Sequence, residues 1–264
     1  MNIVTTADSG FAHCLIELAK SVRKYYGKPI IVYDLGLTED NKKELDAEII
    51  PFIVDEQINY QGKAYLSPDG HESTRATHKP FCVKHYFENY NEPMILVDAD
   101  CLFTVRVELT GFDFGLTYAP RKKEKDIVFY NGRFNSGVMF FNTPMFDLID
   151  KWAQKCRGDN TTDQKAISDV ISEQLDWGNY KQLQHWGDYS VKMLDPAIYN
   201  DHHLTKKGKV LHFITSKHRE GIYEKLIEGL EQGKDIRKMF SQIKRGKVSR
   251  TEKIIRKIKS IFSR

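Results

Sequence analysis

The sequence lacks any long run of apolar residues. None of its 264 residues lies in an apolar stretch near the roughly 18–20 residues of a membrane-spanning helix, which excludes an integral membrane protein. Residues 1–10 also lack a basic segment followed by a long apolar one, so we expect no signal peptide. Hydrophobic residues nevertheless make up 41% of the chain, enough for a large core. Length and composition predict one α/β domain or two small ones.

Cysteine is scarce and widely spaced. Cys14, Cys82, Cys101 and Cys156 form no C-x-x-C pair, which argues against both a disulfide scaffold and a structural zinc site. We therefore expect a chain that works in a reducing cytosol.

Glycine-rich nucleotide-binding motifs are also missing. Residues 5–11, after the first predicted strand, hold no G-x-G-x-x-G, and the chain contains no G-x-x-x-x-G-K-[ST]. These absences exclude a Rossmann dehydrogenase and a P-loop enzyme. A sugar nucleotidyltransferase would need a glycine-rich, arginine-bearing loop near its N-terminus, and none is present.

Positive charge is concentrated at the end of the chain. Residues 244–264 hold nine Lys/Arg and one Glu, a net charge of +8, so the total of +4 leaves −4 for residues 1–243. The tail carries one apolar stripe at helical spacing, formed by Ile254, Ile255, Ile258, Ile261 and Phe262. A basic amphipathic helix of this kind favours binding to an anionic membrane surface. A helix docked on the body is the alternative, and nucleic-acid binding is disfavoured because no recognised module is present.

The apolar pattern predicts strands and helices in alternation. Strands at 2–6, 30–33 and 49–54 alternate with helices at 11–26 and 38–48, which indicates a parallel sheet with crossover helices. Residues 55–78 are polar and irregular. The elements expected beyond them are strands at 94–97, 114–118, 127–130, 138–141, 191–194 and 210–214, with helices at 80–90, 145–156, 163–175 and 222–230.

Two carboxylates follow the most apolar of these strands. Asp98-Ala99-Asp100 comes directly after residues 94–97, at the edge of an α/β sheet where ligands bind. Two neighbouring buried carboxylates need a cation, and hard oxygen ligands select Mg²⁺ or Mn²⁺. The alternative is a surface turn with two solvated acids.

Further motifs recur in a fixed order around this pair. They are Thr5-Thr6-Ala7-Asp8, Lys79-Pro80, Val97-Asp98-Ala99-Asp100, Phe134-Asn135-Ser136-Gly137-Val138, Asp163-Gln164, and Leu211-His212-Phe213 followed by Lys217. Over residues 2–220 this series resembles the nucleotide-sugar glycosyltransferases of the GT-A fold, and it is most similar to glycosyltransferase family 8. The resemblance implies a Rossmann-like, mostly parallel sheet flanked by helices, as one domain at 1–243 with a basic C-terminal helix at 244–264.

The resemblance assigns the first motifs to the nucleotide. Thr6, Ala7 and Asp8 would line the base site, with Asp8 accepting the imide N–H of uracil. Phe11 would stack on the base, or else belong to the core of the first helix. Lys79 would meet the diphosphate as a point charge, or else be a solvated helix start.

The same resemblance implies a metal site and a diphosphate site. Asp98, Asp100 and His212 would bind Mn²⁺ (or Mg²⁺), with Ala99 near the ribose. A structural histidine is the alternative for His212. Lys217 would stabilise charge on the departing diphosphate; the usual glycine and proline–tryptophan around it are replaced by Ser216-Lys217-His218-Arg219, so its neighbours could share that role.

The remaining motifs would contact the donor sugar. Asn135 and Ser136 would lie beside it, with Gly137 allowing close backbone approach, or forming a strand entry with a bulge. Asp163 would bind sugar hydroxyls, or cap a helix after Thr161-Thr162. Gln164 would face the anomeric carbon, and its neutral amide is a poor nucleophile, so the resemblance implies retention by front-face attack.

Together these inferences predict a metal-dependent hexosyltransferase. It would use a UDP-sugar and a saccharide or lipid-linked saccharide acceptor, in the cytoplasm at the inner face of the membrane. The alternative is a catalytically inactive protein of the same fold that binds nucleotide sugar or serves as a membrane-associated scaffold.

Overall fold

The computed structural model describes residues 1–55, 58, 75–118, 132–159, 161–176, 181–214 and 221–247. Three sequence predictions lie outside these residues: the strand at 127–130, the position of Lys217, and the tail beyond residue 247. Within the described part, no helix is both long enough and apolar enough to cross a lipid bilayer.

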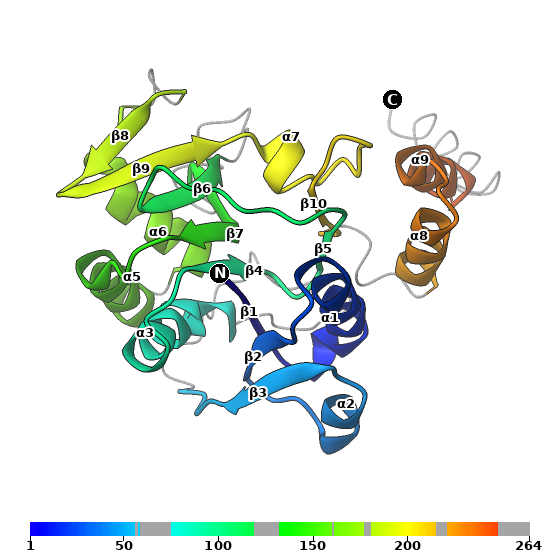
Figure 1. The fold of residues 1–264 in the computed structure, drawn as a ribbon, viewed down its shortest axis with the longest axis horizontal. Helices are drawn as coiled ribbons and strands as arrows, with labels where there is room; N and C mark the ends of the chain where they lie inside the picture. The colour runs from blue at the N-terminus through cyan, green and yellow to red at the C-terminus, as the bar shows by residue number, and fades with distance from the viewer. Residues whose placement is uncertain are drawn as a thin grey trace, which may run out of the picture.

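An eight-stranded sheet in the order β3-β2-β1-β4-β7-β6-β9-β8 forms the centre of the molecule (Figure 1). Its first half is parallel and contains β1 (Asn2–Ala7), β2 (Ile30–Asp34), β3 (Ala47–Pro51) and β4 (Met94–Val97). The chain runs outward from β1 to β2 and β3, and then returns to place β4 on the other side of β1. The sequence prediction of a parallel sheet is confirmed for this half.

The second half of the sheet is mixed. It contains β7 (Phe134–Phe141), β6 (Phe114–Tyr118), β9 (Tyr189–Leu194) and β8 (Leu183–Trp186). β7 runs antiparallel to both β4 and β6, while β6 and β9 are parallel and β8 returns antiparallel to β9. The pairing of β6 with β7 shifts register between Leu116 and Thr117, so β7 bulges near its start.

Helices cover both faces of this sheet, so its central strands β4 and β7 are buried on both sides (Figure 1). Along β4, Met94 and Leu96 face the cluster formed with α3 (Lys79–Asn89), α5 (Phe146–Gly158) and α6 (Asp163–Ser172). Ile95 and Val97 face the opposite cluster, formed with α1 (Ala12–Tyr26). This alternation of side chains gives the sheet two apolar faces that pack against helices, so polar side chains gather at the ends of the strands.

A smaller two-stranded sheet lies beside the main one. β5 (Cys101–Phe103) pairs antiparallel with β10 (Val210–His212), and the pair places His212 directly opposite Cys101. Behind this sheet, α8 (Ile222–Glu231) and α9 (Ile236–Lys247) pack on a third apolar cluster through residues such as Leu226, Met239 and Phe240. The boundary expected between residues 243 and 244 therefore falls inside α9.

Several element boundaries differ from the sequence expectations. The helix expected at 38–48 is reduced to α2 (Glu39–Lys43), which starts at a capping box of Thr38 and Asn41, and β3 begins earlier than expected. Short α7 (Pro196–Tyr199) and strands β5 and β8 were not expected. All three are too short for a periodic pattern. β5 pairs with β10, which is distant in the sequence, whereas β8 forms a hairpin with the adjacent β9 around Gly187 and Asp188.

Candidate active site

The sequence-predicted site residues gather in one cleft at the edge of the main sheet. The cleft lies at the carboxyl ends of β1 and β4, where the strand order reverses direction and open α/β sheets place their ligands. Lining residues from the prediction are Thr6, Ala7, Asp8, Phe11, Lys79, Asp98, Ala99, Asp100, Asn135, Ser136, Asp163, Gln164 and His212. The fold therefore joins six sequence-distant motifs, while Lys217 lies outside the described residues.

Two carboxylates and one imidazole converge at the floor of the cleft. The Nε2 atom of His212 lies 3.1 Å from Oδ1 of Asp100 and 3.5 Å from Oδ2 of Asp98. His212 and Asp100 are buried, and the side chain of Asp98 is 26% exposed. Backbone bonds hold this arrangement, since Asp98 N–H donates to the carbonyl of Gly137 and Phe213 N–H donates to that of Asp100. The alternative of a solvated surface turn is wrong, because Asp100 has no exposed area.

Lys79 lies between two carboxylates at the start of α3. Its Nζ atom is 2.5 Å from Oδ1 of Asp98 and 2.9 Å from Oδ2 of Asp163, and the residue is 4% exposed. Burial alone would lower the pKa of this ammonium, but the charges of Asp163 and Asp98 outweigh burial and raise the pKa. The alternative of a solvated helix start is wrong. The structure places Lys79 as a link between Asp98 and Asp163, whereas the sequence suggested a point charge facing the diphosphate.

Asp163 is held at the first turn of α6 by several contacts. Its Oδ2 accepts hydrogen bonds from Lys79 and from the hydroxyl of Ser136 at 2.6 Å, and its carbonyl accepts from the indole of Trp152. Thr162 is the N-cap of the helix, since its hydroxyl accepts from the N–H of Lys165. The expectation that Asp163 itself could cap the helix is wrong, and its carboxylate instead belongs to the cleft.

The bulge in β7 brings the backbone at Gly137 against His212 and Asp98. Asn135 Oδ1 accepts from the N–H of Gly137 at 2.8 Å, which closes a tight turn inside the strand. A Cβ atom on Gly137 would overlap Cε1 of His212 and lie 2.9 Å from Oδ2 of Asp98. Glycine is therefore required here by the close approach of those two side chains. The bulge and the close approach, which the sequence left as alternatives, occur together.

The other end of the cleft is formed by the turn after β1. Asp8 accepts from the N–H of Gly10 through Oδ1 and starts the short 3₁₀ turn Ser9–Phe11. Phe11 is partly buried against the apolar cluster of α1 and also lines the cleft, so the core position is present and stacking on a base stays a prediction. Thr6 and Ala7 complete this wall at the end of β1.

The donor set fits a hard divalent cation. Within the described residues, donor atoms of Asp100, Cys101 and His212 lie within 4.8 Å of one another, and Asp98 adjoins them through His212. Burial raises the pKa of the Cys101 thiol well above its usual value, so carboxylate oxygen and imidazole nitrogen are the available donors. The carboxylates of Asp98 and Asp163 contact the ammonium of Lys79, whereas that of Asp100 lies against His212. Acidic groups therefore outnumber the ammonium in this part of the cleft, an excess that a divalent ion would balance.

Sequence reasoning missed other residues of the cleft. Arg75 and Thr77 line it from the short turn before α3, and Arg75 donates to the carbonyl of Leu35. Asn200, which follows α7, does not line the cleft but hydrogen-bonds Asn135 and His212 beneath it. The segment 75–78 belonged to a region without a pattern, and a single asparagine carries no sequence signal for such a position.

Comparisons with known proteins support the fold. An active-site mutant of the glycosyltransferase LgtC is 16% identical over 88% of this chain and 96% of its own, with a TM-score of 0.50. The bifunctional glycosyltransferase WbbM is 12% identical over 81% of this chain, which spans 45% of WbbM, with a TM-score of 0.51. This chain has the GT-A fold.

The GT-A fold predicted from the sequence is thereby confirmed, while the basic C-terminal helix stays a prediction. A glycosyltransferase involved in glycosylating the major capsid of PBCV-1 is a further similar structure, 11% identical over 82% of this chain and 95% of its own, with a TM-score of 0.49. No family model matches the sequence, and no curated protein is similar to it at the sequence level. Within the GT-A fold, the assignment of this chain's chemistry therefore depends on its own side chains.

Proposed function

We propose that the protein is a metal-dependent glycosyltransferase that moves a hexose from a nucleotide diphosphate sugar, with UDP as carrier, to a saccharide acceptor. The observation that carries this proposal is the convergence of Asp98, Asp100 and His212 at the floor of a cleft that the other predicted site residues line. An acidic group at the switch point of an α/β sheet suits a cation that binds phosphate oxygens.

Three side chains would hold the cation. Asp98 and Asp100 would supply oxygen ligands and His212 its Nε2, a donor set that favours Mn²⁺, with Mg²⁺ as the second choice. When bound, the ion supplies positive charge beside the diphosphate leaving group. Lys79 fixes Oδ1 of Asp98, so the other oxygen of that carboxylate stays turned towards His212.

The walls of the cleft would select the donor. At one end, Asp8 would accept the imide N–H of uracil and Phe11 would offer an aromatic face to the base. Lys79 is already paired with Asp98, so its charge is not directed at the phosphates. Arg75, in the short turn before α3, lines the cleft and would supply positive charge to them. Lys217 keeps its proposed role at the diphosphate.

The opposite wall would bind the sugar. Lys79 and Ser136 both contact Oδ2 of Asp163, so Oδ1 would accept donor-sugar hydroxyls, with Asn135 beside them. Gln164 follows Asp163 at the start of α6 and lines the same cleft. An amide cannot form a stable glycosyl ester, so we propose retention through attack on the same face as the departing diphosphate.

The tail would bring the enzyme to its acceptor. Residues 244–264 carry a net charge of +8, and each basic residue contributes on the order of 1 kcal/mol near an anionic surface. We propose that this segment binds reversibly to anionic lipids, where a lipid-linked saccharide would be presented. Deleting residues 248–264 should weaken binding to vesicles rich in anionic lipid while donor hydrolysis continues, and unchanged vesicle binding would refute the anchor.

Screening a panel of sugar nucleotides for Mn²⁺-dependent hydrolysis tests the activity itself. We expect at least one UDP-hexose to be hydrolysed, with turnover lost on chelation and in Asp163→Asn. Asp150→Asn, which breaks an exposed ion pair with Lys84, is the matched control and should retain full turnover. Tight UDP-sugar binding with no turnover, with or without saccharide acceptors, would instead favour the inactive binding protein or scaffold.

A further inference from the structure

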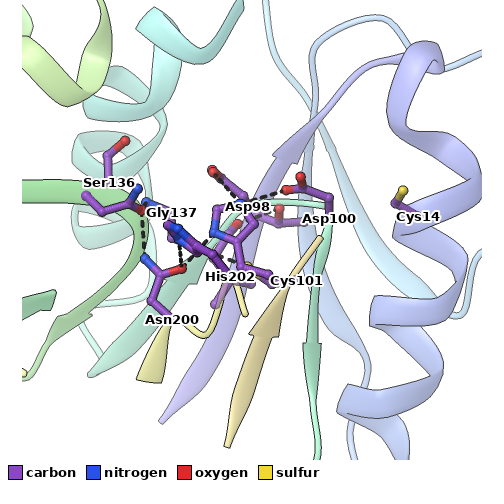
Figure 2. A network of polar contacts seen from close by, with 12 residues as sticks. Cys14, Asp98, Asp100, Cys101, Ser136, Gly137, Asn200 and His202 are labelled. Carbon is purple, nitrogen blue, oxygen red and sulfur yellow. Dashed lines mark hydrogen bonds and ion pairs between the residues drawn. The ribbon is translucent and has the colours of Figure 1, made fainter. Parts of the chain in front are cut away.

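Asn200 is buried between Asn135, in the wall proposed to bind the sugar, and His212, one of the proposed metal ligands. It is 1% exposed and follows α7, outside every motif that the sequence singled out. Its amide nitrogen donates to Oδ1 of Asn135 at 2.7 Å and to the hydroxyl of Thr117 at 2.9 Å. Its amide oxygen lies 2.7 Å from Nδ1 of His212 and 3.0 Å from Nε2 of His202. Figure 2 shows the contacts that run from Asn200 towards Asp98 and Asp100.

The orientation of this network starts from a backbone group. The N–H of Gly137 can only donate, and it lies 2.8 Å from the side-chain tip of Asn135. The atom of Asn135 at that position must therefore be its oxygen. A backbone donor thus settles which way the amide of Asn135 faces, and the bulge of β7 holds that donor in place.

The same reasoning passes to Asn200. Its side-chain tip lies 2.7 Å from the oxygen of Asn135, so it must present an N–H there. The reverse orientation would place two amide oxygens in contact with no hydrogen between them. The oxygen of Asn200 consequently faces His212 and His202, and the four hydrogen-bonding positions of the Asn200 amide are all used.

The last step concerns the imidazole. Because the oxygen of Asn200 can only accept, Nδ1 of His212 must carry a hydrogen. The opposite nitrogen, Nε2, is the atom that lies 3.1 Å from Asp100 and 3.5 Å from Asp98. In the neutral ring this hydrogen on Nδ1 leaves the lone pair on Nε2, directed at the two carboxylates, an arrangement that a cation between them would stabilise.

We infer that Asn200 is a positioning residue, which sets the tautomer and ring orientation of His212 so that Nε2 serves as a ligand to a divalent cation. This inference rests on the metal site of the proposed function. It also gives Asn135 a second role. Its Oδ1 accepts from both the N–H of Gly137 and the amide of Asn200, so the backbone donor fixes the orientation of both side chains. The path from Gly137 through Asn135 and Asn200 to His212 is here called the amide relay.

The tautomer can be measured in the wild-type protein without metal or substrate. Nitrogen-15 labelling of histidine and long-range ¹H–¹⁵N correlation spectra distinguish a protonated ring nitrogen from a bare one, and His212→Gln identifies the resonance among the nine histidines. We expect Nδ1 of His212 to carry a hydrogen. A bare Nδ1 together with an Nε2–H would overturn the inference, whatever the protein catalyses.

A variant pair tests the effect on metal binding. Asn200→Leu keeps a similar side-chain shape and removes the acceptor for His212 together with the donors to Asn135 and Thr117. We expect Mn²⁺ affinity, measured by the electron paramagnetic resonance of free Mn²⁺, to fall about 10- to 100-fold. Thr117→Val removes one hydrogen bond to Asn200 but leaves the amide relay intact, so its affinity should match the wild type. Folded Asn200→Leu with wild-type affinity would overturn the inference.

The two proposals fail in different ways. A wild-type protein that binds no Mn²⁺ would contradict the proposed metal site, and the histidine spectrum would still decide the tautomer. Wild-type Mn²⁺ binding with a bare Nδ1 would contradict the amide relay and leave the glycosyltransferase proposal standing. If Asn200→Leu does not fold, the wild-type spectrum by itself supports or overturns the inference.

Discussion

Helix α3 carries two lysines in ion pairs whose surroundings differ sharply. Lys79, at its start, lies 2.5 Å from Asp98 and 2.9 Å from Asp163, with its side chain 5% exposed. Lys84, one and a half turns later, lies 2.7 Å from Asp150, with its side chain 39% exposed. The distances are alike, but the first lysine lies with Asp98 and Asp163 in the lining of the cleft and the second lies on the surface.

The difference teaches that ion-pair geometry alone does not reveal function. A surface pair gains little because water already solvates both charges. A buried pair carries a large desolvation cost, which apolar residues would avoid, so its retention needs another reason. Here the pair has a distinct position, because Lys79 contacts both Asp98 and Asp163, which line the cleft from different segments of the chain.

The largest expected effect comes from removing the buried cation. Lys79→Met would leave Asp98 and Asp163 without their shared partner, and breaking a buried pair costs about 3–5 kcal/mol. Chemical denaturation would measure this loss in the free energy of unfolding. A loss too small to resolve would show that the cluster tolerates uncompensated carboxylates, and the comparison between the two lysines would fail.

The pH dependence of that loss has a defined sign. The pKa of Lys79 is raised in the folded protein, so its stabilisation is complete below the unfolded value of about 10.4 and disappears only as pH rises through the folded pKa. Titration of Lys79 should therefore add no pH dependence to unfolding between about pH 6 and 9. Denaturation of wild type and Lys79→Met across this range would check it.

The next effect is on cation binding. Asp100→Asn preserves the side-chain shape but removes the most deeply buried charge beside His212. We expect Mn²⁺-dependent UDP binding, measured by calorimetry, to weaken by more than the about 10- to 100-fold that the loss of an outer-shell partner costs, because a direct ligand is removed. Normal Mn²⁺-dependent affinity in this variant would refute the metal assignment.

A backbone position should show an intermediate effect. Gly137→Ala would place a methyl group against the ring of His212 and 2.8 Å from the side chain of Asn135, both of which the amide relay holds. Such overpacking costs about 1–3 kcal/mol, and the displaced imidazole should also bind Mn²⁺ more weakly. Gly158→Ala, at the end of α5, meets no atom within 4 Å and serves as the control for thermal unfolding.

The smallest effect is expected at the second lysine of the comparison. The pKa of Lys84 is raised mainly by its hydrogen bond to Asp150, but water surrounds the pair. Lys84→Met should leave thermal unfolding, Mn²⁺ binding and donor hydrolysis unchanged. A clear loss of stability in this variant would mean that the exposure of an ion pair does not predict its contribution to the stability of this protein.

Local sequence patterns predicted much of the fold. The apolar run of β4 and the helical spacing of α1 depend only on neighbouring residues, so both elements lie close to where they were expected. The order of short motifs was enough to identify the GT-A fold. Strand β5 escaped because its three residues form a strand only with the distant β10, whereas β8 escaped because its four residues, paired with the adjacent β9, are too few for a periodic pattern.

The sequence predicted which residues meet in the cleft but not the contacts between them. The motifs pointed to Asp98, Asp100 and His212 as neighbours, and the cleft contains all three. Nothing in the sequence indicated that Lys79 would link two of the carboxylates, because that contact spans 84 residues between Lys79 and Asp163. Asn200 was likewise out of reach, since an isolated asparagine carries no spacing that distinguishes a buried relay from a surface loop.

By itself, the sequence determined the alternation of strands and helices, the acidic pair after a buried strand, and the basic tail, because each depends on residues that are close along the chain. Only the tertiary structure decided which charges share a buried cluster, which amide faces which imidazole, and why position 137 has no room for a side chain. Those properties depend on distances between residues far apart in the chain, and packing around the sheet edge sets them.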